Sequence, residues 1–248
     1  MDRLAKQAGV IVISISSHFL AQAQMNPKYQ FGLGIGTFVY QGDLTPSNPG
    51  SYKTMKPQVN FFAARLLSSS FSVRANFFAG SLKGDDSKYA NPAYRQERNF
   101  KFRSSVTEIS GVGEWNVLGR NYVSKGIAPY VFGGVGYSFL RIRRDWSQLN
   151  TEYFSAESSL MEGLAADQQH SVPKGLLVLP VGLGVRYYLS DKIGVQAETS
   201  YRLSATDYLD GFSRSANPGE KDHYYSHSIG VIYRPGKKSN FDCPVISY

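Results

Sequence analysis

Apolar and polar residues alternate along eight segments of the chain, each about the length of a strand that crosses a membrane. The pattern is clearest in residues 101–118, where Ile109 and Trp115 fall on one face. The opposite face of that segment carries polar residues such as Glu108 and Glu114. Because side chains of a strand point alternately to its two sides, the pattern predicts strands with one apolar and one polar face. The predicted strands are residues 29–40, 57–67, 71–82, 101–118, 128–142, 175–189, 193–207 and 224–234.

The connections between these segments alternate between short and long. Short links join strands two and three, four and five, and six and seven, while the long connections are residues 41–56, 83–100, 143–174 and 208–223. This alternation is typical of outer-membrane barrels, in which turns are periplasmic and loops extracellular. We therefore predict an all-β fold, an eight-stranded antiparallel transmembrane β-barrel of the outer-membrane type. Within the third loop an amphipathic run near residues 156–166 suggests a short helix, and a binding role for this loop stays open.

Six charged residues lie near the middle of predicted strands, on the faces opposite the apolar ones. A charge facing lipid is costly, so these side chains must point inward, and a soluble barrel with an apolar interior is disfavoured. The lumen of eight strands is only wide enough for side chains, and buried charges there must pair. Inward glycines are expected to make room for them. The sequence thus predicts a salt-bridge plug, with an ion-conducting path as the alternative; its residues are Arg74, Glu108, Glu114, Arg186, Glu198 and Arg202.

The two ends of the chain differ from the barrel pattern. Residues 1–23 have a short basic start, an apolar run and an Ala-Gln-Ala site, which together predict a secretory signal peptide. The barrel domain is then residues 24–234, and residues 235–248 form a predicted periplasmic tail. Cys243 is the one cysteine, so it is either a free thiol or half of an intermolecular disulfide. The tail is either a partner-binding segment or disordered, and its candidate contact residues are Lys237, Lys238, Phe241, Asp242 and Pro244.

Composition adds little chemistry to this picture. The formal charge of +8 suggests lipopolysaccharide or an acidic protein partner, or simply a solvated basic surface, rather than nucleic acid in an exported chain. His170, His223 and His227 are the candidates for a lipid-modifying triad, but ordinary surface histidines are the preferred interpretation. One cysteine and scattered histidines give no metal-ligand spacing. We predict no catalytic residue, cofactor, metal or small-molecule substrate.

Several segments resemble a known family. They are residues 40–44 (YQGDL), 102–109 (FRSSVTEI) and 129–136 (PYVFGGVG), the Cys243-Pro244 pair, and the segment formed by Thr206, Asp207, Tyr208, Leu209 and Asp210. Together they resemble the PorG-like outer-membrane barrels of the type IX secretion and gliding apparatus. The resemblance implies a non-enzymatic component that ties a periplasmic ring to the outer membrane. It also implies that Cys243 forms a disulfide with the ring lipoprotein. The alternatives are a structural or adhesive barrel that acts through its loops and, least favoured, a lipid-modifying enzyme.

Overall fold

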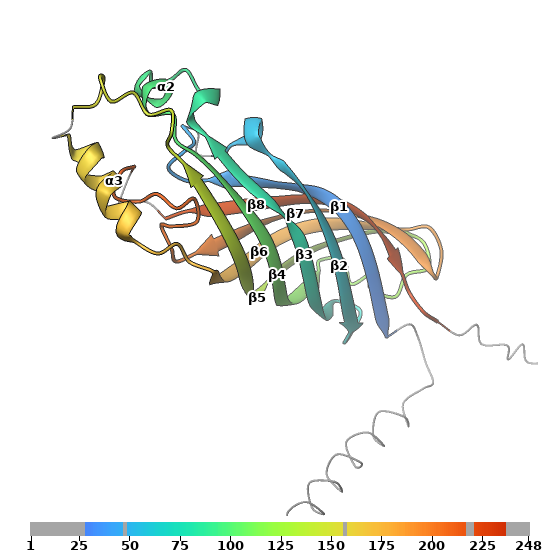
Figure 1. Ribbon diagram of the computed structural model, residues 1–248. Coiled ribbons are helices and arrows are strands. Elements are labelled where there is room, and N and C mark those ends of the chain that lie inside the picture. The colour runs from blue at the N-terminus through green and yellow to red at the C-terminus, as the bar shows by residue number, and fades with distance from the viewer. Residues whose placement is uncertain (1–27, 47–48, 156–157, 217–220, 237–248) are drawn as a thin grey trace, which may run out of the picture.

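The computed structural model describes residues 28–46, 49–155, 158–216 and 221–236, which form a closed antiparallel barrel of eight strands (Figure 1). Each strand pairs with its neighbour in the chain, and β1 pairs with β8 to close the wall. The predicted fold class is therefore confirmed. The predicted signal peptide and residues 237–248 of the tail lie outside the described residues. The strands are β1 (Tyr29–Gln41), β2 (Lys56–Leu66), β3 (Phe71–Asp85), β4 (Lys101–Asn116), β5 (Gly126–Asp145), β6 (Gly175–Tyr188), β7 (Ile193–Ser204) and β8 (His223–Tyr233).

An apolar belt surrounds the barrel on its outside. One row of it can be followed through the register across five strands, from β2 to β6, and consists of Phe61, Phe77, Ile109, Tyr137 and Leu177. All five side chains are exposed, whereas the neighbouring inward residues are mostly buried and include the polar Asn60, Asn76 and Glu108. A soluble barrel would have the opposite arrangement, so the outer surface is suited to lipid. No helix among the described residues is long and apolar enough to cross a membrane.

At the end of the barrel that holds the long loops, β3 and β5 are longer than the sequence suggested. β3 continues to Asp85 and β5 to Asp145, beyond the expected ends at residues 82 and 142. They do so because both strands keep pairing with β4 up to Lys101, which lies opposite Asp85 on one side and Asp145 on the other. In contrast, β7 ends at Ser204 rather than at residue 207. The predicted ends of these three strands were wrong.

The four long loops share one end of the barrel and pack together as a cap, defined here as the described residues of 42–55, 86–100, 146–174 and 205–222. The cap contains the short 3-10 turns η1 (Tyr52–Thr54) and η2 (Asp86–Lys88) and the helices α2 (Tyr94–Arg98) and α3 (Ser159–Gln169). Both helices lie beyond the strands at the same end of the molecule (Figure 1). The helix expected near residues 156–166 corresponds to α3, while α2 was not expected.

A hydrophobic core holds the cap onto the barrel. Phe100 and Phe212, from different loops, stack with ring centroids 4.4 Å apart. Leu44 comes from the first loop and Leu164 from α3 in the third, Leu209 lies in the same loop as Phe212, and all three are buried with residues from the strand ends beneath the cap. The long loops are thus a folded layer with its own core, since apolar side chains from all four contribute to one buried cluster.

Candidate functional site

The six charges predicted to fill the lumen all lie inside the barrel, on β3, β4, β6 and β7. Arg74 contacts Glu114 at 3.0 Å and Glu198 at 2.6 Å, and Arg186 contacts Glu114 at 2.7 Å. Arg202 pairs with Glu108 at 3.1 Å. None of the six side chains is more than 3% exposed. The three acids and three bases therefore form one cluster of four residues and one pair, which are together called the lumen plug below.

Aromatic residues complete the lumen plug. The sequence prediction did not include them, because it considered only the charged residues on the inward faces. The Tyr130 hydroxyl donates to Glu198 at 2.8 Å, and the Tyr224 hydroxyl donates to Glu108 at 2.9 Å. The Arg186 guanidinium lies 4.0 Å from the centre of the Tyr130 ring. Because each carboxylate accepts from a guanidinium and a hydroxyl, the cost of burying the charges is offset by hydrogen bonds as well as by pairing.

Two of the inward glycines, Gly182 and Gly184 on β6, make room for rings rather than for the arginines themselves. A Cβ on Gly184 would lie 2.5 Å from the Tyr130 ring, and one on Gly182 would lie 2.6 Å from the Phe132 ring. In the register Tyr130 lies opposite Gly184 and Phe132 lies opposite Gly182. The expectation that these two glycines accommodate long charged side chains is thereby corrected: they accommodate the aromatic rings. The interior is packed, which favours a closed barrel over a water-filled pore.

The family segment lies in the cap, between β7 and β8, and each of its residues contacts another part of the chain. The Thr206 carbonyl accepts from the backbone N–H of Asp222, and Asp207 accepts from the Ser213 hydroxyl. Leu209 is fully buried in the core of the cap. Thr206, Asp207 and Leu209 therefore fold the loop back on itself and hold it down.

The other two residues of the segment reach across the cap. The Tyr208 ring stacks on His170 with centroids 4.1 Å apart, and its hydroxyl donates to Asp167 in α3 at 3.3 Å. Asp210 accepts from the Tyr40 hydroxyl of β1 at 2.7 Å. The segment thus joins the last loop to α3 and to the first strand. It lies at the loop end, whereas the predicted partner-binding tail follows β8 at the other end.

Asp210 and Asp222 form a buried carboxyl pair around one hydroxyl. Tyr40 lies 2.7 Å from an oxygen of each carboxyl group, yet it has one proton to donate. Burial raises the pKa of Asp210 well above that of an ordinary carboxyl group, and the charge of Asp222 adds to this. Burial likewise raises the pKa of Asp222. The pair therefore retains a proton above the pH at which exposed carboxyl groups lose theirs.

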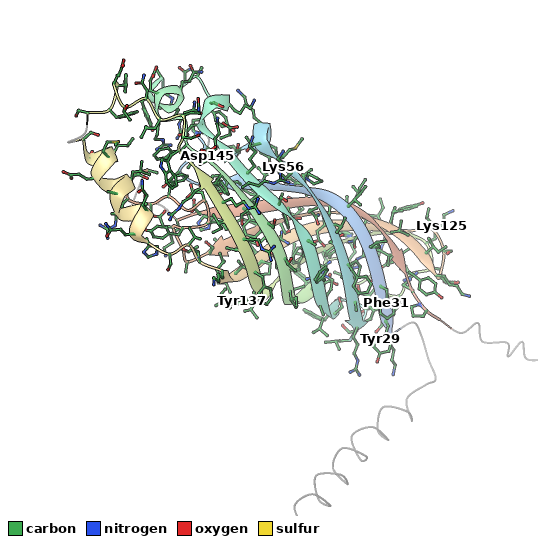
Figure 2. All side chains as sticks on the ribbon, viewed as in Figure 1. Tyr29, Phe31, Lys56, Lys125, Tyr137 and Asp145 are labelled. Atoms are coloured by element: carbon green, nitrogen blue, oxygen red, sulfur yellow. The ribbon has the colours of Figure 1, made fainter. Side chains whose placement is uncertain are left out.

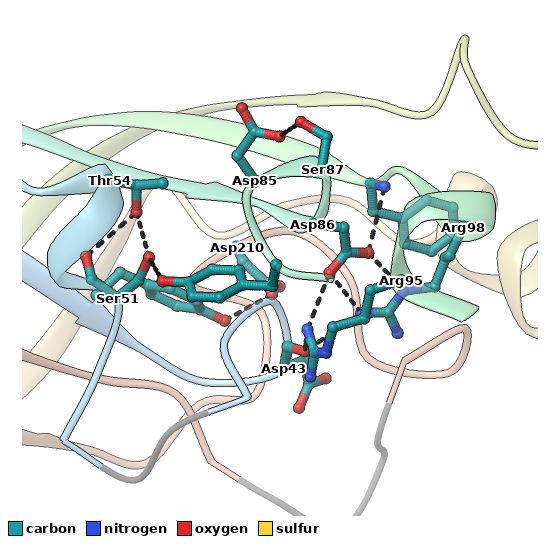
Figure 3. A network of polar contacts seen from close by, with 12 residues as sticks. Asp43, Ser51, Thr54, Asp85, Asp86, Ser87, Arg95, Arg98 and Asp210 are labelled. Atoms are coloured by element: carbon teal, nitrogen blue, oxygen red, sulfur yellow. Dashed lines mark hydrogen bonds and ion pairs between the residues drawn. The ribbon is translucent and has the colours of Figure 1, made fainter. Parts of the chain in front are cut away.

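A third carboxylate of the cap, Asp86, is paired with two arginines (Figure 3). It is completely buried and pairs with Arg95 at 2.9 Å and with Arg98 at 2.7 Å. Both arginines, which come from α2, also donate to the Asp43 carbonyl at 3.0 and 3.2 Å. The loop between β3 and β4 is thus joined to the loop between β1 and β2. Sequence reasoning missed this cluster, because its spacing of 9 and 12 residues matches no strand or helix face.

Asp167 of α3 is held by backbone N–H groups. Its carboxylate accepts from the N–H groups of Ser213, Arg214 and Ser215 at 3.2, 3.1 and 2.9 Å. Burial by itself would raise the pKa of Asp167, but these bonds and that of the Ser215 hydroxyl outweigh it, and the net pKa lies below the ordinary value. A carboxylate among several donors is stable in its charged form. It fastens α3 to the last loop.

Arg234 organises the rim at the end of the barrel opposite the cap. It directly follows β8, is 1% exposed, and its guanidinium lies 3.8 Å from the centre of the Tyr188 ring. It donates to the carbonyls of Asn121 and Val123 in one turn and of Ser190 and Asp191 in another. The point at which the chain leaves the barrel is therefore fixed. The predicted tail residues Lys237, Lys238, Phe241, Asp242, Cys243 and Pro244 lie outside the described residues.

With this geometry in hand, comparison with known proteins gives a family. Residues 6–234 match the family model described as a domain of unknown function, DUF6089. The chain belongs to this family. No curated protein matches the chain.

Solved structures similar to this DUF6089 chain include several small outer-membrane proteins. Neisserial surface protein A has a TM-score of 0.47 and 13% identity, covering 84% of this chain and 97% of that one. The attachment invasion locus protein Ail of Yersinia pestis, in complex with the heparin analogue sucrose octasulfate, has a TM-score of 0.44 and 10% identity, covering 83% and 96%. OprG from Pseudomonas aeruginosa has a TM-score of 0.42 and 13% identity, covering 84% and 96%.

The histidines of the DUF6089 chain do not form a convergent triad within the described residues. His227 bonds Thr199 at 2.8 Å and Tyr52 at 3.1 Å, whereas the next residue, Ser228, points to the interior. His223 accepts from the backbone N–H of Ser204 and lies against the Tyr201 ring. No group of three or more His, Cys, Asp or Glu side chains among the described residues is placed to hold a metal ion.

Proposed function

We propose that this DUF6089 chain is a non-enzymatic structural barrel of the outer membrane that holds a periplasmic partner through its C-terminal tail. The observation that carries the proposal is the contrast between a packed interior and a fixed exit point. The lumen plug fills the barrel with paired charges and rings, so transport through the lumen is disfavoured. Arg234 holds the start of the tail against two turns. A tail leaving from a rigid rim is suited to fasten another protein to the membrane.

The more specific proposal is that the partner is the periplasmic ring of a type IX secretion machine, with Cys243 bonded to the ring lipoprotein. Its support is the resemblance of residues 40–44, 102–109, 129–136 and 206–210 to the barrels of that apparatus. The chain would be exported by its signal peptide and inserted into the outer membrane, where lipid and lipopolysaccharide surround it. A lone cysteine in an oxidising compartment is available for an intermolecular bond.

The proposal is tested by purifying the full chain from detergent-solubilised membranes and analysing bound proteins by non-reducing electrophoresis. We expect a band of higher mass that disappears with reductant and in Cys243→Ser. A matched variant, Ser239→Ala, alters a hydroxyl of the same tail and should keep the band. If no protein is retained by the wild-type chain, or if removing residues 237–248 leaves the same protein bound, the tail is not the partner-binding segment.

A second candidate function is adhesion or membrane integrity through the loops. The observation that favours it is the cap, because four loops that share a core present one stable outer surface. This function predicts that loop substitutions abolish a surface phenotype while removal of the tail does not. Secretion and cell-surface binding measured in the same tail-deletion strain separate the two proposals.

A further inference from the structure

Beyond the proposed function, the outer face of β3, β4 and β5 carries a row of cations where the strands rise above the apolar belt. Lys83, Arg103 and Arg143 lie directly opposite one another on these three strands. Arg141 lies on the same face of β5, two residues closer to the belt, in a row with Ser105 and Ser81. The three arginines are exposed and Lys83 is half-buried. These four residues are called the cationic row below.

Three of the four charges in the cationic row have no counter-charge in contact within the part of the chain that the structure describes. Among the described residues, Arg103, Arg141 and Arg143 have no ion pair or hydrogen bond, while Lys83 pairs with Asp85 at 2.9 Å. The other nearby carboxylate, Asp145, lies opposite Lys101 and accepts from the N–H of Ser147. Like charges directly opposite on neighbouring strands destabilise a sheet. An anion that binds outside the protein would relieve this repulsion.

The position of the cationic row relative to the apolar belt indicates which class of anion binds there. On β5 the outward residues change from Val131 and Val135 to the aromatic pair Tyr137 and Phe139, and then to Arg141 and Arg143. Aromatic residues of a barrel mark the boundary between hydrocarbon and headgroups. Two residues of a strand span about 7 Å, so Arg141 lies one step above that boundary. Figure 2 shows this strand from Tyr137 to Asp145, at the end of the barrel with the cap.

We propose that the cationic row binds the phosphate groups of a phosphorylated lipid in the outer leaflet, with its acyl chains against Tyr137, Phe139 and the apolar belt. Guanidinium groups match phosphate oxygens in pairs of parallel hydrogen bonds, and the hydroxyls of Ser81 and Ser105 can add donors. The continuity of the row with the belt favours a lipid over a soluble anion. The proposal is independent of whether the chain serves secretion.

The test is native mass spectrometry of the full chain in detergent, titrated with a bis-phosphorylated glucosamine lipid (lipid A). We expect the triple variant R103Q, R141Q, R143Q to bind about a hundredfold more weakly, at about fivefold for each arginine. The matched control R65Q, R120Q, K125Q removes the same charge at the periplasmic rim, where Figure 2 labels Lys125. It should stay within about twofold of the wild type.

Each contrary outcome overturns the proposal. Equal weakening in both triple variants would mean that only net charge matters. Unchanged binding in R103Q, R141Q, R143Q would mean that the row is not the site. Equal binding of dephosphorylated lipid, or equal competition by inorganic phosphate or a soluble sulfated sugar, would rule out a lipid headgroup. Folding of the variants is checked by unheated electrophoresis, and R141Q alone, expected to be about fivefold weaker, decides the question if the triple variant does not fold.

Discussion

The lumen plug and the cap both bury carboxylates, but they neutralise them in different ways. In the plug every carboxylate meets a guanidinium, and three acids face three bases across the barrel. In the cap Asp86 has two arginines, Asp167 has backbone donors, and Asp210 and Asp222 share the hydroxyl of Tyr40. The plug thus balances acids with bases, whereas the Asp210–Asp222 pair of the cap depends on a retained proton.

The difference follows from the backbone that holds each region. Strands place side chains at fixed intervals around a closed wall, so charges from four strands meet at the centre of the barrel. Loops have no such periodicity, and each carboxylate there is satisfied by whatever donor the local turn supplies. We expect substitutions in the plug to lower the stability of the whole barrel, and substitutions in the cap to destabilise only the loops.

The largest expected effect is that of Glu114→Gln in the plug. Arg74 and Arg186 would keep their charges while losing the carboxylate that both contact. Breaking a buried ion pair from one side costs about 3–5 kcal/mol, so the free energy of unfolding should fall by that amount. Urea unfolding in detergent micelles measures it, with Glu152→Gln in an exposed loop as control. A loss below about 1 kcal/mol would mean that water enters and replaces the carboxylate.

The next largest effect is expected from Asp86→Asn in the cap. Arg95 and Arg98 would lose their counter-charge but keep the Asp43 carbonyl, so we expect a cost of about 3 kcal/mol, confined to the cap. Trypsin should then cut after Arg95 and Arg98, which are buried in the wild type, while the barrel stays intact on unheated electrophoresis. Asp191→Asn, in an exposed turn of the opposite rim, is the control. Unfolding of the whole barrel would contradict the local character of the cap.

The contrast also explains how much of this molecule could be read from the sequence. Alternation and loop lengths predicted the eight strands, and the charge on the polar faces predicted the six plug residues, because both depend on a period of two. The hydrogen bonds of Tyr130 and Tyr224 to the plug were missed although both residues lie on the same inward faces. The identity of a tyrosine on a strand does not indicate which acceptor its hydroxyl contacts. The pairing of Tyr130 with Gly184, which leaves space for the ring, would have indicated that Tyr130 fills the lumen, but it can be recognised only when the register of β5 and β6 is known.

Apart from α3, the contacts that hold the cap together were beyond sequence reasoning for a physical reason. Asp210 and Asp222 lie 170 and 182 residues after Tyr40 in the sequence. Only the closure of β1 on β8 brings the three side chains together. Arg234 was recognised as the end of a strand, but its four carbonyl acceptors come from turns whose backbone direction the sequence does not specify. Contacts between loops depend on where the closed wall places them.

A smaller effect is expected from pH: the cap should lose stability as the pH rises, whereas paired carboxylates usually lose stability as the pH falls. Since burial raises the pKa of Asp210 and of Asp222 in the folded cap, the stability they contribute is complete below the ordinary carboxyl pKa of about 4 and is lost as pH rises. The backbone N–H groups of Leu209 and Phe212 donate hydrogen bonds to these carboxyl groups. Their amide protons should exchange faster at pH 9 than at pH 6, relative to the amide protons of the strands.

The matched variant for this pH effect is Asp222→Asn, which removes one of the two charges. We expect it to flatten the pH dependence and to hold the cap more tightly than the wild type at pH 9, by about 1–2 kcal/mol. Asp167 provides an internal contrast, because its lowered pKa gives stability that is present at neutral pH and lost on acidification. Protection of Leu209 that rises with pH in the wild type would show that the pair is fully charged and compensated.

The smallest effect is expected from Tyr208→Phe in the family segment. The change removes one hydrogen bond of 3.3 Å to Asp167 but keeps the ring on His170 and the donors from Ser213, Arg214 and Ser215. A single neutral donor to a carboxylate that already has several should cost about 0.5–1 kcal/mol, measured as faster amide exchange at Ser215. Tyr153→Phe, on an exposed ring, should change nothing. A cost above about 2 kcal/mol would mean that Tyr208 sets the position of α3, and the cap would then resemble the plug in depending on one residue.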